Sequence, residues 1–146
     1  MAFAPTGGFW ASNPNVYTPA NTVAAVVPRP PDFPEGQPVT IQAVSTNGRF
    51  VALGRGSTDP GYQREARWLY DTTTGQFLTA GQVLGAAHAG KQITNVVFLA
   101  NGGMVVSTYD PAAAEHSWHY VTQLGSVVAT VVAPGPILTG RFAYLS

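Results

Sequence analysis

The sequence contains no cysteine, a single lysine and few charges of either sign. Without cysteine the chain can form neither a disulfide framework nor a reactive thiolate. Charged residues make up 10% of the 146 positions and the formal net charge is zero, so the basic footprint of a nucleic-acid-binding protein is absent. No apolar run approaches the roughly 18 residues of a membrane helix. The first residues also lack the basic-then-apolar pattern of a secretory signal. We therefore expect neither nucleic acid nor a membrane as a partner.

Signatures of catalysis are also missing from the sequence. It has no Gly-x-Ser-x-Gly motif, phosphate loop or dinucleotide fingerprint. His116, His119 and the neighbouring Glu115 have the residue types of a metal site. On a strand, however, a spacing of three places two side chains on opposite faces, and His88 is predicted to lie in a distant loop. We interpret these histidines as ordinary surface residues and expect no enzyme activity, metal or cofactor.

An internal repeat is the most informative feature that the sequence does contain. Residues 47–53 (Asn-Gly-Arg-Phe-Val-Ala-Leu) resemble residues 101–107 and residues 139–145. Further along the same units, residues 65–72 match residues 115–122, including a Trp and a Tyr at equivalent places. A short repeated unit cannot bury its apolar face alone, so the copies are expected to stack on one another.

Each full copy is predicted to form four short antiparallel strands, because β-branched and aromatic residues alternate with turn residues. In the second copy we expect strands at 93–99, 104–108, 117–121 and 126–132. The Gly of each Asn-Gly pair suits a tight hairpin with positive φ. Only residues 80–90 have the composition of a short helical turn. The predicted divisions are repeat 1 at 38–82, repeat 2 at 91–133 and a half repeat at 136–146.

Residues 46–53 and 68–76, with an Asn-Gly hairpin followed by an aromatic strand and Asp-x-x-x-Gly, resemble blades of β-propellers of the WD40 and TolB type. The resemblance covers roughly residues 38–132, and in the second copy Val121 stands where the aspartate is expected. It implies an all-β fold of two or three four-stranded blade-like repeats. A β-sandwich or a barrel built from the same hairpins is the alternative. The resemblance implies no activity, because propellers include enzymes, scaffolds and lectins.

The two ends of the chain are predicted to be halves of a third unit. Residues 136–146 match the first hairpin of a repeat and then stop. Residues 16–27 resemble the second half of a repeat, with Tyr17 at the place of Tyr70 of the first copy. These two segments are therefore expected to pair as one composite blade.

A proline-rich segment separates the N-terminal residues from the first full repeat. Residues 28–38 contain five prolines, which favour polyproline II at about 3.1 Å per residue and give a reach on the order of 30 Å. We expect residues 1–37 to be an arm and linker that carries the N-terminus onto a neighbouring subunit. The candidate interaction residues of this arm are Phe9, Trp10, Tyr17, Pro30, Pro31 and Phe33.

The low charge gives a first functional hypothesis. A charged fraction of 10% lies well below the roughly 25% of ordinary proteins, so other subunits are expected to cover much of the surface. The chain is then a non-enzymatic structural subunit of a symmetric assembly such as a virus or phage particle, as a capsid decoration, head or tail protein. Its partners are copies of itself and other structural proteins. The expected location is the virion, or otherwise the cytoplasm.

The alternative hypothesis is an oligomeric, lectin-like protein that binds glycans. Sugars stack on aromatic rings while polar neighbours fix their hydroxyls, and the residues that fit these roles are Glu65, Arg67, Trp68, Glu115 and Trp118. Packing between neighbouring units explains the same aromatic residues. On that interpretation both indoles are mostly buried between sheets.

Overall fold

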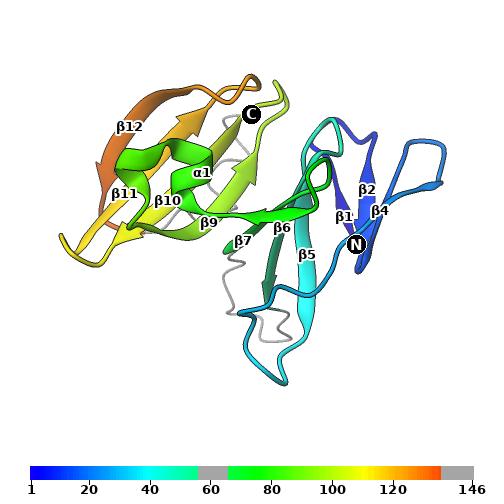
Figure 1. Ribbon diagram of the computed structural model, residues 1–146. Helices are drawn as coiled ribbons and strands as arrows, with labels where there is room; N and C mark the ends of the chain where they lie inside the picture. Colours follow the sequence, from blue (N-terminus) through cyan, green and yellow to red (C-terminus); the bar gives the residue numbers. More distant parts are fainter. Residues whose placement is uncertain (56–65, 136–146) are drawn as a thin grey trace.

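Twelve strands form three four-stranded antiparallel sheets in the computed structural model, which describes residues 1–55 and 66–135 (Figure 1). Sheet A contains β1 (Ala2–Phe3), β2 (Trp10–Ser12), β3 (Asn15–Tyr17) and β4 (Val23–Val26). Sheet B contains β5 (Val39–Val44), β6 (Phe50–Arg55), β7 (Trp68–Asp71) and β8 (Gln76–Leu78). Sheet C contains β9 (Gln92–Phe98), β10 (Met104–Asp110), β11 (Glu115–Val121) and β12 (Val127–Ala133). The all-β prediction is confirmed, and the described strands form no closed barrel.

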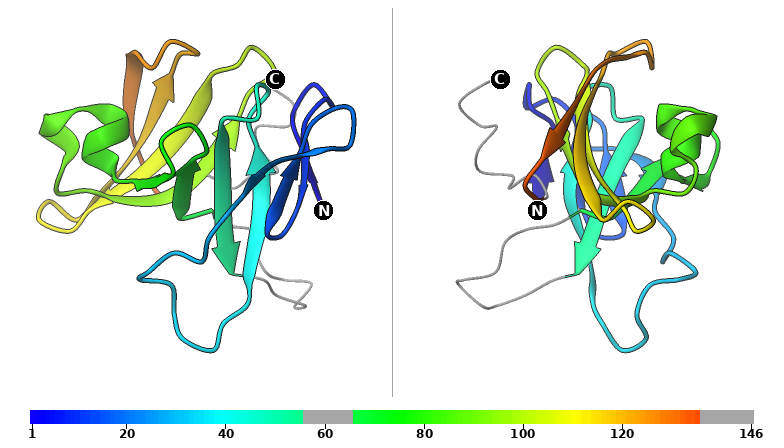
Figure 2. Two further views of the ribbon diagram at one scale, coloured as in Figure 1. Left: turned by 45° about the vertical axis from the view of Figure 1, so that its right-hand side comes forward. Right: turned by 90° about the vertical axis from the view of Figure 1, so that its left-hand side faces the viewer.

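Sheet B lies between the other two sheets, with sheet A on one side and sheet C on the other (Figure 1; Figure 2, left). The first strands of the sheets are neighbours, since β1 and β2 contact β5, and β5 contacts β9. The expected helical turn is present as α1 (Ala80–Leu84) and the 3-10 turn η1 (Ala86–His88), which link sheet B to sheet C. In the described ranges, no helix has the length and apolar character needed to cross a membrane.

The strand register confirms the sequence repeat between sheets B and C. Leu53 of β6 lies opposite Trp68 of β7, and the equivalent Ser107 of β10 lies opposite Trp118 of β11. Trp68 follows Leu53 by 15 positions, whereas Trp118 follows Ser107 by 11, so the first copy is four residues longer at this connection. A connection between strands tolerates such an insertion because the loop-closure entropy changes little.

Glycine occupies the same turn position in the first hairpin of each sheet. Gly48 has φ 72° and Gly102 has φ 86°, as the Asn-Gly pairs predict. Gly7 has φ 79°, and its amide donates to the carbonyl of Ala4 as the amide of Gly48 donates to that of Ser45. Positive φ strains residues with a Cβ, so glycine is the residue suited to all three turns. The third predicted turn glycine, Gly140, lies outside the described residues.

The N-terminus differs from the predicted arm with a half blade, because residues 2–26 form a complete third sheet. Trp10 lies opposite Tyr17 in sheet A, as Val51 lies opposite Tyr70 in sheet B. The match between Tyr17 and Tyr70 is therefore correct, but β2 rather than a C-terminal segment pairs with β3. Both edges of β3 are occupied, by β2 and β4. The predicted partner, residues 136–146, lies outside the described residues.

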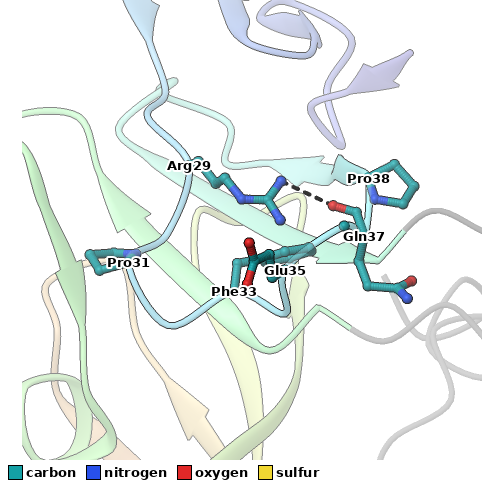
Figure 3. Close-up of a pocket in the computed structure, with 7 residues that line it drawn as sticks. Arg29, Pro31, Phe33, Glu35, Gln37 and Pro38 are labelled. Atoms are coloured by element: carbon teal, nitrogen blue, oxygen red, sulfur yellow. Dashed lines mark hydrogen bonds between the residues drawn. The ribbon is translucent and has the colours of Figure 1, made fainter.

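The proline-rich segment folds back as a cap on sheet B, close to the start of β5. Arg29 lies at its centre and donates to the carbonyls of Gln37 and Pro34 at 3.0 and 2.8 Å (Figure 3). The Arg29 guanidinium also lies 4.8 Å from the centroid of the Phe33 ring. Phe33 contacts the indole of Trp68 with centroids 4.5 Å apart. These contacts join the segment to its own chain, which differs from the extended, 30 Å reach that the prolines predict.

The two sheet interfaces use different faces of the repeated unit. Sheet A packs through Ala11 and Val16 on the face of sheet B that carries Val51 and Tyr70. These two faces are not equivalent within the unit. The same arrangement is found in propellers, where rotation relates successive units, so that one face of each unit packs on the other face of the next. Sheets B and C instead bury equivalent faces.

On the sheet B side of that second interface lie Ala52 and Leu69. On the sheet C side lie Val106, the equivalent of Ala52, and Met104. The stack therefore resembles a propeller at its first interface only, and the second interface shows that like faces of these units can pack together.

An ion pair fixes the Asn-Gly hairpin of sheet B. Arg49 donates from Nε and Nη2 to the two carboxylate oxygens of Asp71, at 3.1 and 2.9 Å. Asp71 is buried and also accepts from the amide of Thr73. Its hydrogen bonds with Arg49 lower the pKa of the Asp71 carboxyl and raise the pKa of Arg49. Sheet C has Gly103 and Val121 at the corresponding positions, so this ion pair is particular to sheet B.

Candidate interaction surface

Sheet A exposes an apolar face on the side that points away from sheet B. Phe3, Trp10, Tyr17 and Val23 are aligned across its four strands, one from each. Paired residues in neighbouring strands point to the same face of a sheet. Phe3 is 60% exposed and Val23 is 54% exposed, whereas Trp10 and Tyr17 are half-buried by each other. The face extends to Val26, which is also exposed. We call these five residues the open face of sheet A.

The equivalent positions in sheet B are covered. Val51, the counterpart of Trp10, is fully buried, and Tyr70, the counterpart of Tyr17, is 7% exposed. Both lie in the core between sheets A and B. The repeat therefore places apolar residues on this face in each unit, and sheet A is a unit whose face has no covering layer within the described chain.

The aromatic pair at the centre of the open face has a fixed geometry. The rings of Trp10 and Tyr17 stack with centroids 4.1 Å apart and an interplanar angle of 15°. The indole N–H of Trp10 donates to the side chain of Asn21, and the amide of Asn15 donates to the Tyr17 hydroxyl at 3.1 Å. Rings held in place lose little conformational entropy when a partner packs on them. This suits the pair to protein recognition.

The structure places the other four interaction candidates elsewhere. Phe9 packs over the turn at Gly48, where a Cβ atom would overlap its ring. Pro30 and Phe33 are buried, so they hold the proline-rich cap in place and present no surface to a partner. Pro31 is exposed and lines a shallow hollow of about 680 Å³ within that cap (Figure 3).

The residues of the lectin hypothesis are divided between two sheets. Arg67 and Trp68 line a hollow of about 410 Å³ where sheets B and C meet, together with Asp32, Phe77 and Lys91. Glu115 and Trp118 lie on β11 and are not among the residues that line this hollow. Glu65 lies outside the described residues.

Both tryptophans of the repeat are half-buried, which is less than the burial between sheets predicted for them. Each indole N–H already has a partner in the chain. That of Trp68 donates to the Asp32 carboxylate at 2.9 Å, and that of Trp118 donates to the carbonyl of Gly135 at 2.9 Å. Phe33 covers the Trp68 ring. These contacts make both indoles structural anchors, because neither presents a free ring with an unused donor.

A buried histidine joins β10 to β12 in sheet C. His119 is fully buried, with Nε2 2.9 Å from the Thr108 hydroxyl and Nδ1 3.0 Å from the Thr130 hydroxyl. His88 of η1 packs edge-on against it with ring centroids 4.9 Å apart. Two predictions were thus wrong, since His119 is a core residue and His88 approaches it closely. The described residues contain no group of three or more side chains suited to hold a metal ion.

Burial keeps the His119 ring neutral. The pKa of His119 falls to about 4, mainly because the charged imidazolium is desolvated and secondarily because His88 and Lys91 are close. The pKa of His88 is lowered as well, mainly by burial and secondarily by the charge of Lys91. The neutral ring donates from one nitrogen and accepts at the other, so it can satisfy one hydroxyl on each side.

Sequence reasoning named Trp10 and Tyr17 of the open face but missed Phe3, Val23 and Val26. It also did not recognise β1 and β2. The signals are present, however. Residues 6–9 (Thr-Gly-Gly-Phe) repeat the pattern of residues 47–50 (Asn-Gly-Arg-Phe), and the Asn13-Pro14 pair marks the next turn. Comparison with known proteins adds no identification: no family model, curated protein or solved structure matches this chain.

Proposed function

We propose that this protein is a non-enzymatic structural subunit that associates with copies of itself through the open face of sheet A. The observation that carries the proposal is the exposure of Phe3 and Val23 around a preformed Trp10–Tyr17 stack, on a face that sheet B keeps buried. An apolar patch of this kind is typical of a protein–protein contact. The small number of charged residues supports the same function, because few charges have to be desolvated when subunits meet.

The proposed occupant is sheet A of a second copy, related by a two-fold axis. The other face of sheet A, which carries Ala11 and Val16, is already buried against sheet B. The equivalent faces of sheets B and C are buried against each other. A second copy therefore has no unlike face to offer, and only like faces can meet. Sheets B and C already pack like faces in this way, although the faces they use are the opposite ones, which carry Ala52 and Val106.

The size of the open face limits the strength of this contact. The four strands are two to four residues long, and with strands about 4.8 Å apart and about 3.3 Å per residue they cover only about 190 Å². A standard stable interface covers about 800 Å² per partner. The sheet A contact is therefore weak by itself, and a permanent assembly needs at least one further contact.

The setting predicted from the sequence, a virus or phage particle, is part of this proposal and is supported by the low charge and the self-complementary surface. Mass spectrometry of purified particles tests it by detecting peptides of this chain. The WD40/TolB resemblance remains a hypothesis about the repeated unit, supported by the equivalent hairpins. Glycan binding is less favoured, because Phe33 and Asp32 already occupy the ring and N–H of Trp68.

Sedimentation equilibrium of the purified chain over a wide concentration range tests the self-association. Phe3→Asp introduces a charge at the open face, so it should lower the average mass at high concentration. Leu124→Asp is the matched control, because Leu124 is 94% exposed in the turn between β11 and β12 and lies outside the face. Equal masses for the wild type and Phe3→Asp contradict the proposal.

A further inference from the structure

In the part of the chain that the structure describes, the outer edge of strand β12 in sheet C pairs with no other strand. Strand β12 is the terminal strand of that sheet and lies at its outer margin (Figures 1 and 2). Residues 128–132 are all exposed, and Val131 and Val132 are 55% and 68% exposed. Natural proteins usually protect a free edge with charges, proline, glycine bulges or a very short strand. The seven residues 127–133 (Val-Val-Ala-Thr-Val-Val-Ala) contain no charge, proline or glycine.

The strand is also formed and held before any partner arrives. Residues 129–133 pair in regular register with residues 116–120 of β11, and the one irregularity of this ladder lies before them, towards Val127. The Thr130 hydroxyl is hydrogen-bonded to the buried ring of His119 at 3.0 Å. A preformed edge loses little entropy on pairing, so its free backbone groups are a ready template for another strand.

The regular segment, residues 129–133 (Ala-Thr-Val-Val-Ala), resembles its own reverse in side-chain size and carries no charge. We propose that β12 pairs antiparallel with β12 of a second copy, with Val131 on the two-fold axis. This register places Ala129 opposite Ala133 and Thr130 opposite Val132. Each cross-strand pair is then small or β-branched, and no charge faces another, which is favourable for directly opposed residues. The result is a continuous eight-stranded sheet shared by two copies.

This contact deepens the proposed function by supplying the second contact that the small open face requires. The two contacts lie on different sheets, A and C, at opposite sides of sheet B (Figure 1). A subunit with two different two-fold contacts cannot satisfy both within one dimer unless their axes coincide. Copies therefore join alternately through sheet A and β12 into an extended or ring-shaped array.

Charge complementation tests the β12 contact independently of sheet A. In the Phe3→Asp background, Val131→Lys and Val131→Glu each place two side chains of like charge opposite each other, with Cβ atoms about 4.5–5.5 Å apart across the axis. Each variant alone should raise the dimer dissociation constant by about tenfold or more. An equimolar mixture should restore the dimer, because opposite charges then face each other. Leu124→Lys in the same background is the control for added charge and should remain dimeric.

The absence of cysteine allows a second readout of the register. Oxidised Val131→Cys should yield a disulfide-linked dimer, whereas Leu124→Cys should not, because only the first places two thiols close together across the axis. The proposal is overturned if both Val131 charge variants keep the dimer, or if their mixture stays monomeric. If Phe3→Asp leaves the mass unchanged while Val131→Lys lowers it, the sheet A contact fails and the β12 contact stands. The reverse result overturns the β12 contact alone.

Discussion

Acidification from about pH 6.5 to pH 4 should destabilise the protein by up to roughly 3 kcal/mol through His119 alone. Its pKa in the folded protein is about 4, against 6.5 for an ordinary histidine. Between these two values the unfolded chain binds a proton that the folded protein excludes, so the free energy of unfolding falls as the pH falls. Each unit of pKa difference is worth about 1.36 kcal/mol, and the full difference is present above pH 6.5. The depressed pKa of His88 adds to the loss in the same direction.

Urea unfolding at pH 7, 6, 5 and 4, analysed by linear extrapolation, measures this dependence. His119→Gln keeps a side chain that can donate and accept but removes the titrating ring, so its stability should change much less between pH 7 and 4. The His119→Gln variant should be less stable than the wild type at pH 7, because the glutamine side chain fills the space of the imidazole ring less well. The Asp71 contribution should appear only below its ordinary pKa of 3.8, outside this window. Parallel pH profiles for the wild type and His119→Gln would refute the assignment of a buried neutral ring.

Two further predictions concern the hairpin of sheet B, and both are measured by thermal or urea unfolding. Gly48→Val should cost about 2 kcal/mol or more, because it combines strain at φ 72° with overlap of the Phe9 ring. Gly125→Val, at φ 88° with no atom within 4 Å of an added Cβ, should show the strain alone, so equal losses in the two variants would exclude a Phe9 contact. Asp71→Asn should cost on the order of 2 kcal/mol at neutral pH, less than for a fully buried pair because the Arg49 side chain is 45% exposed. Asp110→Asn, at the end of β10, keeps an oxygen that can accept from the amide of Ala112. It should change stability by less than about 0.5 kcal/mol, and a loss comparable to that of Asp71→Asn would argue against the ion pair.

The strands of sheet C show how far local pattern alone can lead. Predicted bounds of 93–99, 104–108, 117–121 and 126–132 agree with β9 to β12 within two residues at each end. This agreement arises because β-branched runs and the positive-φ glycines at Gly102 and Gly125 are local signals that need no tertiary information.

The N-terminal sheet shows where local pattern fails. Its strands are two to four residues long, too short for alternation to be recognised, and its turn has Thr6 in place of the asparagine seen in sheet B. Proline content likewise predicted an extended arm, because proline fixes φ but does not determine what the segment packs against. The contacts of Arg29 and Phe33 that fold it back involve residues up to Trp68, which sequence spacing does not bring together.

The sequence by itself determined the unit of construction: four short strands, an Asn-Gly or Thr-Gly hairpin, and an aromatic third strand, repeated along the chain. Those features depend on backbone preferences and on which side chains alternate. Only the tertiary structure decided which face of each unit is covered. Tyr17 and Tyr70 show the physical reason, since they occupy the same position on the third strand of a repeat. Tyr70 is buried between sheets A and B, whereas Tyr17 remains at the open face of sheet A. Burial depends on neighbours far away in the chain, and it is burial that sets the pKa of His119 and leaves an apolar face and a bare strand edge for a partner.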